Sequence, residues 1–281
     1  MDSDCPQRSL FEVRQVHFAY PGGDVVLDDI SFDVLEGASM ALMGANGCGK
    51  STLLKVLDGL LFPMKGNIRF FGEELSENAL KSDNFNRWFR RNVGFIFQQS
   101  DIQLFSPTVE EEIAFGPLHL HLSPQQVKQR VEDISEMLEI THLLQRPPYL
   151  MSGGEKKKVA LASVLSLNPS VLLLDEPSAG LDPRSQMWLV ETLKKLHNAG
   201  KTIVIASHDL DIVDDIADTV VIFNEKHRIE EVGPAKETLK NTEMLLRVNL
   251  IHEHYHRHGD EIHSHVHAHD SEHKHQHDDD E

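Results

Sequence analysis

The chain is 281 residues long and 40% of its residues are hydrophobic, enough for one large globular domain or two small ones. Its 27 Lys and Arg against 45 Asp and Glu give a formal net charge of -18, which repels phosphate backbones and argues against a nucleic-acid partner. The longest run without a charged residue, Val159–Leu174, has 16 residues and is too short to span a bilayer. The two cysteines, Cys5 and Cys48, make no disulfide framework, so we expect a reducing, cytoplasmic setting.

Apolar runs of strand length alternate with helical patterns along residues 1–249, which we expect to form the folded body. In chain order, they predict a strand over Ser39–Met43, a helix over Ser51–Leu60 and a strand over Gly94–Phe97. Ser123 then starts one helix as its N-cap, and a further helix begins near Ser152. The remaining predicted strands are Val171–Leu174, Thr202–Ala206 and Thr219–Phe223. This alternation predicts an α/β fold built on a parallel sheet.

The last 32 residues, 250–281, have a different composition. They contain eleven His, nine acidic and two basic residues, and almost no aliphatic side chains. Such a segment cannot bury enough apolar surface to fold by itself. We therefore predict a disordered, flexible His-rich tail after the body.

Residues 44–52 read GANGCGKST and satisfy the phosphate-loop pattern G-x-x-x-x-G-K-[ST] between a predicted strand and a predicted helix. In such a loop, glycines let backbone amides converge on phosphate oxygens, and the helix adds its positive end. Lys50 is expected to reach the β and γ phosphates, and Ser51 to hold Mg2+. The predicted nucleotide-binding residues are Gly44, Ala45, Asn46, Gly47, Cys48, Gly49, Lys50, Ser51 and Thr52.

Cys48 lies in the middle of this loop. Converging amides and a helix N-terminus favour a thiolate, so one hypothesis is that alkylation of Cys48 blocks ATP binding. The alternative is that Cys48 is a small residue that fits the loop.

Two adjacent carboxylates, Asp175 and Glu176, follow an apolar strand in the segment VLLLDEP. Ligands of α/β folds bind at the carboxyl edge of the sheet, so both residues should face the nucleotide. Successive residues at a strand end point in different directions. We therefore expect one of the two acids to orient Mg2+ through water and the other to activate the attacking water.

A second potential anion site lies at Leu150–Leu161, which reads LMSGGEKKKVAL. Ser152, Gly153 and Gly154 would open a helix with exposed amides. This segment resembles the signature loop of the ATP-binding-cassette (ABC) ATPases, usually LSGGQ, which caps the γ-phosphate bound by the other subunit. Glu155 replaces the usual Gln and puts a carboxylate near that cap.

Further motifs of the same family occur in order over roughly residues 10–235. By this resemblance, Tyr20 stacks on adenine and Gln98 senses Mg2+ and the lytic water. Asp182, in SAGLDP, crosses the dimer interface, and His208 contacts the γ-phosphate. The implied catalytic residues are Glu176, His208 and Gln98, and the implied Mg2+ ligands are Ser51, Gln98 and Asp175.

The resemblance also implies the fold, the reaction and the partners. It implies a P-loop NTPase (RecA-like) core with an antiparallel β subdomain and a helical subdomain inserted over about residues 100–160. Two copies of the chain would bury ATP and Mg2+ between them, so that hydrolysis opens the dimer. The motion would pass through Ser100–Pro117 to membrane-embedded partners, which places the chain peripherally at the cytoplasmic face of the cell membrane.

The segment Thr108–Pro117 (TVEEEIAFGP) resembles ATPases of energy-coupling-factor importers, which take up vitamins and the ions of nickel and cobalt. Ser178–Pro183 favours the same group. The implied partners are a membrane coupling protein and a substrate-binding membrane component.

Histidines of the tail alternate with other residues, so an extended chain puts each group of them on one side. Imidazole suits Zn, Cu, Ni and Co, and the resemblance to nickel and cobalt importers favours Ni2+ or Co2+ as the ion that a metal-buffering tail holds. A solvated tail without a role in metal handling and an engineered tag are the alternatives. The candidate ligands are His252, His254, His256, His258, His263, His265, His267, His269, His273, His275 and His277.

Three other functions stay open at this point. The same ATPase could serve a different cargo, zinc or a vitamin. A soluble ABC ATPase in translation or DNA repair would have no membrane partner, although such relatives generally carry two cassettes or a long coiled-coil insertion. A metal store with an inactive cassette is disfavoured by the intact Lys50, Glu176 and His208. The sequence equally leaves open whether a second ATPase chain replaces one copy of the dimer.

Overall fold

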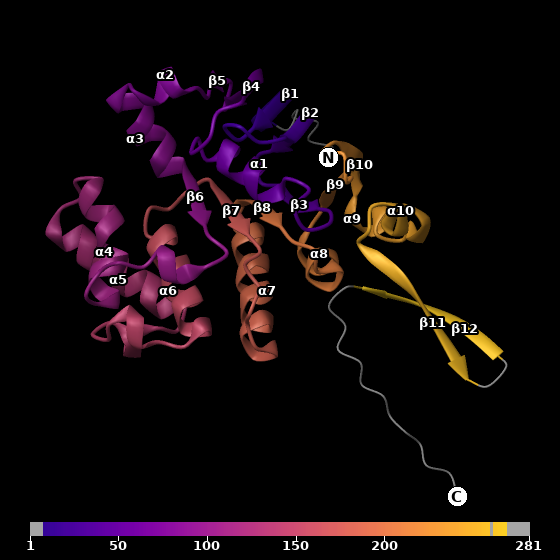
Figure 1. Cartoon of the computed structure of the whole chain (residues 1–281). Helices are drawn as coiled ribbons and strands as arrows, with labels where there is room; N and C mark the ends of the chain where they lie inside the picture. The colour runs from indigo at the N-terminus through magenta and orange to yellow at the C-terminus, as the bar shows by residue number, and fades with distance from the viewer. Residues whose placement is uncertain (1–7, 259–260, 269–281) are drawn as a thin grey trace, which may run out of the picture.

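A computed structural model describes residues 8–258 and 261–268, with side chains described for residues 8–251. Its central element is a six-stranded sheet in the order β10-β9-β3-β8-β7-β6 (Figure 1). Five strands of this sheet, β3, β6, β7, β8 and β9, run parallel to one another, and β10 is antiparallel to β9. The strands are β3 (Ser39–Met43), β6 (Val93–Ile96), β7 (Val171–Asp175), β8 (Thr202–Ala206), β9 (Thr219–Phe223) and β10 (Ile229–Pro234).

The five parallel strands confirm the five predicted from the sequence, each within one residue at either end. β3, β6, β7 and β8 are buried at every position, because layers of structure cover both faces of the sheet. The predicted helix over Ser51–Leu60 is α1 (Lys50–Leu57), which ends earlier because Gly59 adopts a left-handed φ of 65°.

An antiparallel subdomain covers one face of the central sheet (Figure 1). Its strands, in the order β2-β1-β4-β5, are β1 (Ser9–Ala19), β2 (Val25–Leu35), β4 (Lys65–Phe70) and β5 (Glu73–Glu74). Inward residues such as Phe11, Ile30 and Phe70 join the apolar face of α1 and one face of the central sheet in a single core. The helices α2 (Glu77–Leu80) and α3 (Asp83–Asn92) follow, and Phe89 of α3 packs edge-on against Phe70.

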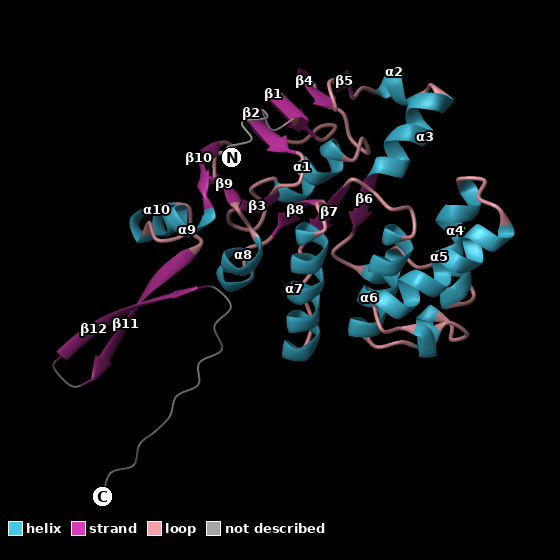
Figure 2. Ribbon diagram, turned by 180° about the vertical axis from the view of Figure 1, so that it is seen from behind, coloured by secondary structure: helices cyan, strands magenta, loops and turns pink. Residues whose placement is uncertain are grey.

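The helical insertion lies between β6 and β7, at the end of the sheet farthest from β10 (Figure 2). It contains α4 (Val109–His119), α5 (Pro124–Met137) and α6 (Gly153–Leu165), with short 3-10 turns at Ser100–Ile102, Thr141–Leu143 and Pro148–Leu150. Ser123 and Ser152 cap α5 and α6 as predicted, each in a reciprocal capping box with the residue three positions on. The α/β core, the antiparallel subdomain and the inserted helices predicted from the sequence are thus confirmed.

The second face of the sheet carries α7 (Pro183–Asn198) and α8 (Leu210–Ile216), which share one core with the inserted helices. After β10, the chain forms α9 (Ala235–Thr238) and α10 (Thr242–Arg247). Leu250 and Ile251 are buried in that same core, 2% and 6% exposed. Within the described residues, no helix combines the length and the apolar character that crossing a bilayer requires.

The segment predicted to be a disordered tail contains two strands. β11 (Ile251–His258) pairs antiparallel with β12 (Glu261–Ala268), and the resulting hairpin follows α10 (Figure 1). The prediction from composition therefore differs from the structure over residues 251–258 and 261–268. Of the candidate metal ligands, His269, His273, His275 and His277 lie outside the described residues.

Gly94 of β6 shows how closely the insertion packs on the sheet. A β-carbon at this position would lie 2.4 Å from Val164 Cγ1 of α6, 3.1 Å from Pro169 Cγ and 3.2 Å from Leu172 Cδ2 of β7. We expect Gly94→Ala to lower the free energy of unfolding by about 1–3 kcal/mol in urea denaturation, because these packed groups cannot all move away. Gly23→Ala is the matched control, since its nearest contact would be 3.5 Å away; equal effects of the two changes would contradict this packing.

Candidate active site

The phosphate loop connects β3 to α1 at the carboxyl edge of the central sheet. Gly44, Gly47 and Gly49 have φ of 148°, 84° and 115°, values that side chains other than glycine rarely adopt. At Gly49, a β-carbon would also lie 2.5 Å from the carbonyl oxygen of Val26. Gly49 caps α1 without any side-chain hydrogen bond, so the amides of the first turn are left for a ligand.

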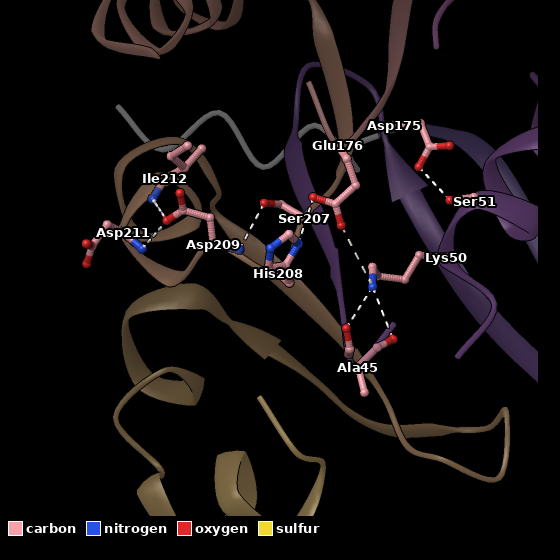
Figure 3. Close-up of polar contacts among 11 residues, drawn as sticks. Ala45, Lys50, Ser51, Asp175, Glu176, Ser207, His208, Asp209, Asp211 and Ile212 are labelled. Atoms are coloured by element: carbon pink, nitrogen blue, oxygen red, sulfur yellow. Dashed lines mark hydrogen bonds and ion pairs between the residues drawn. The ribbon is translucent and has the colours of Figure 1, made fainter. Parts of the chain in front are cut away.

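Lys50 is buried and its amine bends back over the loop. Its Nζ donates hydrogen bonds to the carbonyl oxygens of Gly44, at 2.7 Å, and Ala45, at 3.3 Å. The same nitrogen lies 3.9 Å from Glu176 Oε1 (Figure 3). The lysine thus stands between the loop and the acid at the end of β7.

Ser51 and Asp175 meet across the loop, as the sequence predicts for a cation site. Ser51 Oγ donates a hydrogen bond of 2.7 Å to Asp175 Oδ1 (Figure 3). Burial raises the pKa of Asp175, and the hydrogen bond from Ser51 opposes that rise. A hydroxyl and a carboxylate oxygen in contact are suitable donors for Mg2+, which prefers oxygen ligands, so these residues fit the expected ion.

Glu176 is paired with His208. Its Oε2 lies 2.9 Å from His208 Nδ1, and its side chain is nearly buried (Figure 3). Glu176 has a φ of 42°, in the left-handed region that costs energy for a residue with a β-carbon. This turn directs Glu176 toward His208 and Lys50, while the preceding Asp175 faces Ser51.

A cavity of about 360 Å3 brings these groups together. Gln98, which follows β6 at the start of the helical insertion, contributes to its wall. Glu176 and the phosphate loop supply most of the remaining polar groups. The cavity is lined by Val26, Asn46, Gly47, Gly49, Lys50, Ser51, Thr52, Gln98 and Glu176.

Tyr20 lies beside this cavity. Its hydroxyl is 3.3 Å from Thr52 Oγ1, and its ring packs edge-on against Phe18 with 5.0 Å between the ring centroids. The ring is 41% exposed. An exposed aromatic surface thus lies next to the phosphate loop, and the stacking of Tyr20 on adenine stays a prediction.

The predicted signature residues Ser152, Gly153 and Gly154 lie elsewhere, at the start of α6, and do not line the cavity. Gly154 packs against α7, since a β-carbon there would lie 2.6 Å from Ser185 Oγ. Asp182, the predicted interface residue, caps α7 by accepting hydrogen bonds from the amides of Arg184 and Ser185. These two motifs therefore form one exposed corner separate from the phosphate site. We call it the signature corner; it consists of Ser152, Gly153, Gly154 and Asp182.

Glu155 stabilises that corner, because its carboxylate is paired with neighbouring polar groups. Its Oε2 accepts hydrogen bonds from the amide of Ser152, at 2.8 Å, and from the Ser152 hydroxyl, at 2.9 Å. These bonds hold the pKa of Glu155 below its usual range, and Arg146 lies 3.3 Å away. The carboxylate thus fixes the first turn of α6 and leaves Gly153 exposed.

The expectation that Cys48 is a thiolate is wrong. The side chain is only 3% exposed and belongs to the apolar core beneath the loop. Burial raises the pKa of its thiol, and the nearby Lys50 offsets this only in part. Cys48 therefore fills space under the loop, where a β-carbon on Gly44 would lie 2.7 Å from its sulfur.

Lys157 is a site residue that sequence analysis missed. Its side chain, 3% exposed, donates hydrogen bonds to the carbonyl oxygens of Phe97, at 3.3 Å, and Gln98, at 3.0 Å. It thereby ties α6, which begins at the signature corner, to the loop that carries Gln98. The signal was present: Lys157 lies three and four residues before the buried Ala160 and Leu161, on the apolar face of α6.

Fold and site together define a class of protein. A parallel sheet, a phosphate loop at its carboxyl edge, a lysine inside that loop and a Ser–Asp pair beside it are the parts of a P-loop nucleoside-triphosphatase. The family model of the ABC transporter matches residues 27–179. The chain belongs to this family: it is an ATP-binding, ATP-hydrolysing subunit of an ABC transporter.

Curated relatives match nearly the whole chain. A putative ABC transporter ATP-binding protein of Methanosarcina acetivorans is 50% identical over 88% of this chain and 91% of its own length. The nickel import ATP-binding protein NikO of Rhodobacter capsulatus is 46% identical over 86% of this chain and 95% of its own.

Solved structures agree with the fold. CbiO1 from Clostridium perfringens, part of the ABC transporter complex cbiONQ, has a TM-score of 0.75 at 34% identity, covering 87% of this chain and 96% of that one. A dimeric ATP-binding cassette bound to ADP and Pi has a TM-score of 0.71 at 26% identity, covering 80% of this chain and 98% of that one. Cassettes of this family act as dimers together with the membrane components of their transporters.

The burial of Lys157 makes stability depend on pH. Burial lowers its pKa from 10.5 to about 8, so the unfolded chain binds more protons than the folded chain between these two values. The free energy of unfolding should therefore rise with pH in this range, by up to about 3 kcal/mol. Urea denaturation at pH 7.5, 8.5 and 9.5 should show wild type gaining stability relative to Lys157→Met and Lys157→Arg. Parallel pH profiles for the three proteins would contradict a buried, titrating Lys157.

Proposed function

We propose that this chain is the ATPase of an energy-coupling-factor importer that takes up nickel or cobalt ions. The observation that carries the ATPase site is the cavity lined by Lys50, Ser51 and Glu176. Asp175 is hydrogen-bonded to Ser51, and His208 lies 2.9 Å from Glu176. The similarity to a nickel import ATPase supports the cargo. The similarity to the energy-coupling factor transporter ATP-binding protein EcfA2 of Methanospirillum hungatei, 39% identical over 86% of this chain and 59% of its own length, supports the type of importer.

The geometry supports a task for each polar side chain. Lys50 can exchange its bonds to Gly44 and Ala45 for oxygens of the β and γ phosphates, because its amine already lies inside the loop. Ser51, Asp175 and Gln98 would hold Mg2+, which when bound neutralises the charge of the phosphates. Tyr20 would stack on the adenine beside Thr52.

Glu176 is the residue placed to take a proton from the attacking water. It faces the cavity, and His208 fixes its carboxylate from the far side at 2.9 Å. A base held by a second residue keeps one orientation while water and phosphate arrive. His208 would in turn contact the γ-phosphate.

A single chain does not complete the site. Gly153 and Gly154 offer their amides at the start of a thirteen-residue helix, yet they and Ser152 lie outside the cavity of their own chain. A second copy can place this corner over the phosphates and bring Asp182 to the shared interface. This is the physical basis for proposing a homodimer that closes on ATP and opens after hydrolysis.

A membrane partner would contact the face next to Gln98. Ile102 and Phe105, before α4, are 69% and 65% exposed, and Leu118 at the end of α4 is 54% exposed. Phe105 packs edge-on against the half-exposed Phe115. Such an apolar surface on the segment that leaves the active site is suited to a coupling protein in the membrane, with the ATPase bound peripherally at the cytoplasmic face.

Glu176→Gln tests the catalytic assignment. The amide keeps the shape of the side chain but cannot accept the proton, so ATPase turnover should fall by about 100- to 10,000-fold while ATP binding persists. With ATP and Mg2+, the variant should elute from a sizing column as a dimer. Turnover close to that of wild type would remove Glu176 from the role of base.

The cargo is tested separately, with the ATPase assembled with its membrane partners in lipid vesicles. Uptake of radioactive nickel or cobalt should require ATP and be lost in the Glu176→Gln complex. ATP-dependent uptake of zinc or of a vitamin, without nickel or cobalt uptake, would replace the cargo and keep the ATPase. A chain that hydrolyses ATP but forms no membrane complex would favour the soluble cassette.

A further inference from the structure

The hairpin of β11 and β12 places histidines opposite one another. In its register, His252 faces His267, His254 faces His265 and His256 faces His263, and His258 faces Glu261. Residues directly opposite in an antiparallel pair lie on the same face of the sheet. The seven histidines of the two strands therefore share one face.

The other face has a different composition. Its pairs are Ile251 with Ala268, Glu253 with Val266, Tyr255 with Ser264 and Arg257 with Ile262. No histidine of the two strands belongs to it. The register thus brings the histidines of both strands to the same face. A shift of one residue in the register would put the histidines of one strand on the opposite face from those of the other.

Backbone geometry sets the spacing on the histidine face. Opposite β-carbons are about 5 Å apart, and positions two apart along one strand about 7 Å. Four such positions form a small rectangle, and imidazole nitrogens bind these ions at distances of about 2 Å. Imidazole suits the late first-row divalent ions, among them Ni2+, Co2+, Cu2+ and Zn2+.

We infer that the hairpin is a divalent transition-metal site made of two adjacent rectangles. The first consists of His252, His254, His265 and His267, and the second of His256, His258, Glu261 and His263. Each takes one ion, and both depend on the register of the strands rather than on the number of histidines. The inference rests on the proposed function only in choosing nickel and cobalt as the probes.

The place of the hairpin in the chain also favours this location. The hairpin is joined directly to the body, because Leu250 and Ile251 are buried just before its first histidine. It is therefore attached at a fixed point of the ATPase.

Metal binding and formation of the hairpin are linked. A two-stranded hairpin is marginally stable by itself in water. Ions that bind across the strands favour the paired form by mass action, at a level set by their affinity and concentration. The hairpin should therefore be protected against hydrogen exchange when metal is present.

The experiment exchanges positions without changing composition. In the full-length, untagged protein, each histidine of one central pair trades places with a neighbour: Glu253→His with His254→Glu, and His265→Val with Val266→His. This moves two imidazoles to the opposite face and leaves the number of histidines unchanged. Titration with NiCl2 and CoCl2, followed by calorimetry and by the visible absorption of bound Co2+, gives affinity and stoichiometry.

We expect wild type to bind two ions tightly and the exchanged protein to lose one of them, its affinity at that site falling at least about tenfold. The matched control replaces the four tail histidines His269, His273, His275 and His277 with Gln and should keep both ions. Equal binding by wild type and the exchanged protein would overturn the inference, since it would show that only the number of histidines matters.

Failure here is separable from failure of the proposed function. Metal titration needs neither ATP nor a membrane partner, and the exchanged residues lie outside the cavity around Lys50. ATPase turnover should be the same in wild type and in the exchanged protein. Absent transport of nickel would leave the titration unaffected, and an altered titration would leave the Glu176→Gln result unaffected.

Discussion

The parallel pairing of β3, β8 and β7 is the constraint on which the active site depends. Leu42 of β3 pairs with Ala206 of β8, and Ala206 also pairs with Asp175 of β7, so the three strands end at one level. Three loops therefore leave the sheet side by side. They carry the phosphate loop, the Asp175–Glu176 pair and His208, which are far apart in the sequence. Buried apolar strands make this alignment rigid, since a slip in register would expose their side chains.

The same fold leaves the chain catalytically incomplete. The signature corner at Ser152 does not line the cavity at Lys50, so under the proposed function the two would meet between two subunits. Lys157 of α6 connects them within one chain, because it donates a hydrogen bond to the carbonyl oxygen of Gln98. A shift of α6 on dimer closure would then move Gln98 and, beyond it, the apolar face around Phe105. Hydrolysis and the membrane partner would in this way be connected through packed side chains.

The metal site that we infer on the hairpin would add a second kind of chemistry to the chain. The nucleotide site uses buried charges, backbone amides and oxygen ligands, which suit phosphate and Mg2+. The hairpin has histidines at opposed positions of its register, and nitrogen ligands suit later transition metals. Leu250 and Ile251, which precede the first histidine of the hairpin, belong to the same core that supports α7 and α8. The two sites can thus be altered one at a time.

The sequence by itself determined the local motifs: the phosphate loop, the strand that delivers Asp175 and Glu176, the Ser152 cap and the five parallel strands. Each depends on contiguous residues whose conformation follows from periodicity, glycines and capping. Only the tertiary structure decided that Cys48 and Lys157 are buried, that Glu155 is satisfied by Ser152, and that His252 faces His267. Burial and cross-strand register arise from contacts between distant parts of the chain. A local sequence pattern does not determine which distant segment will pack against it.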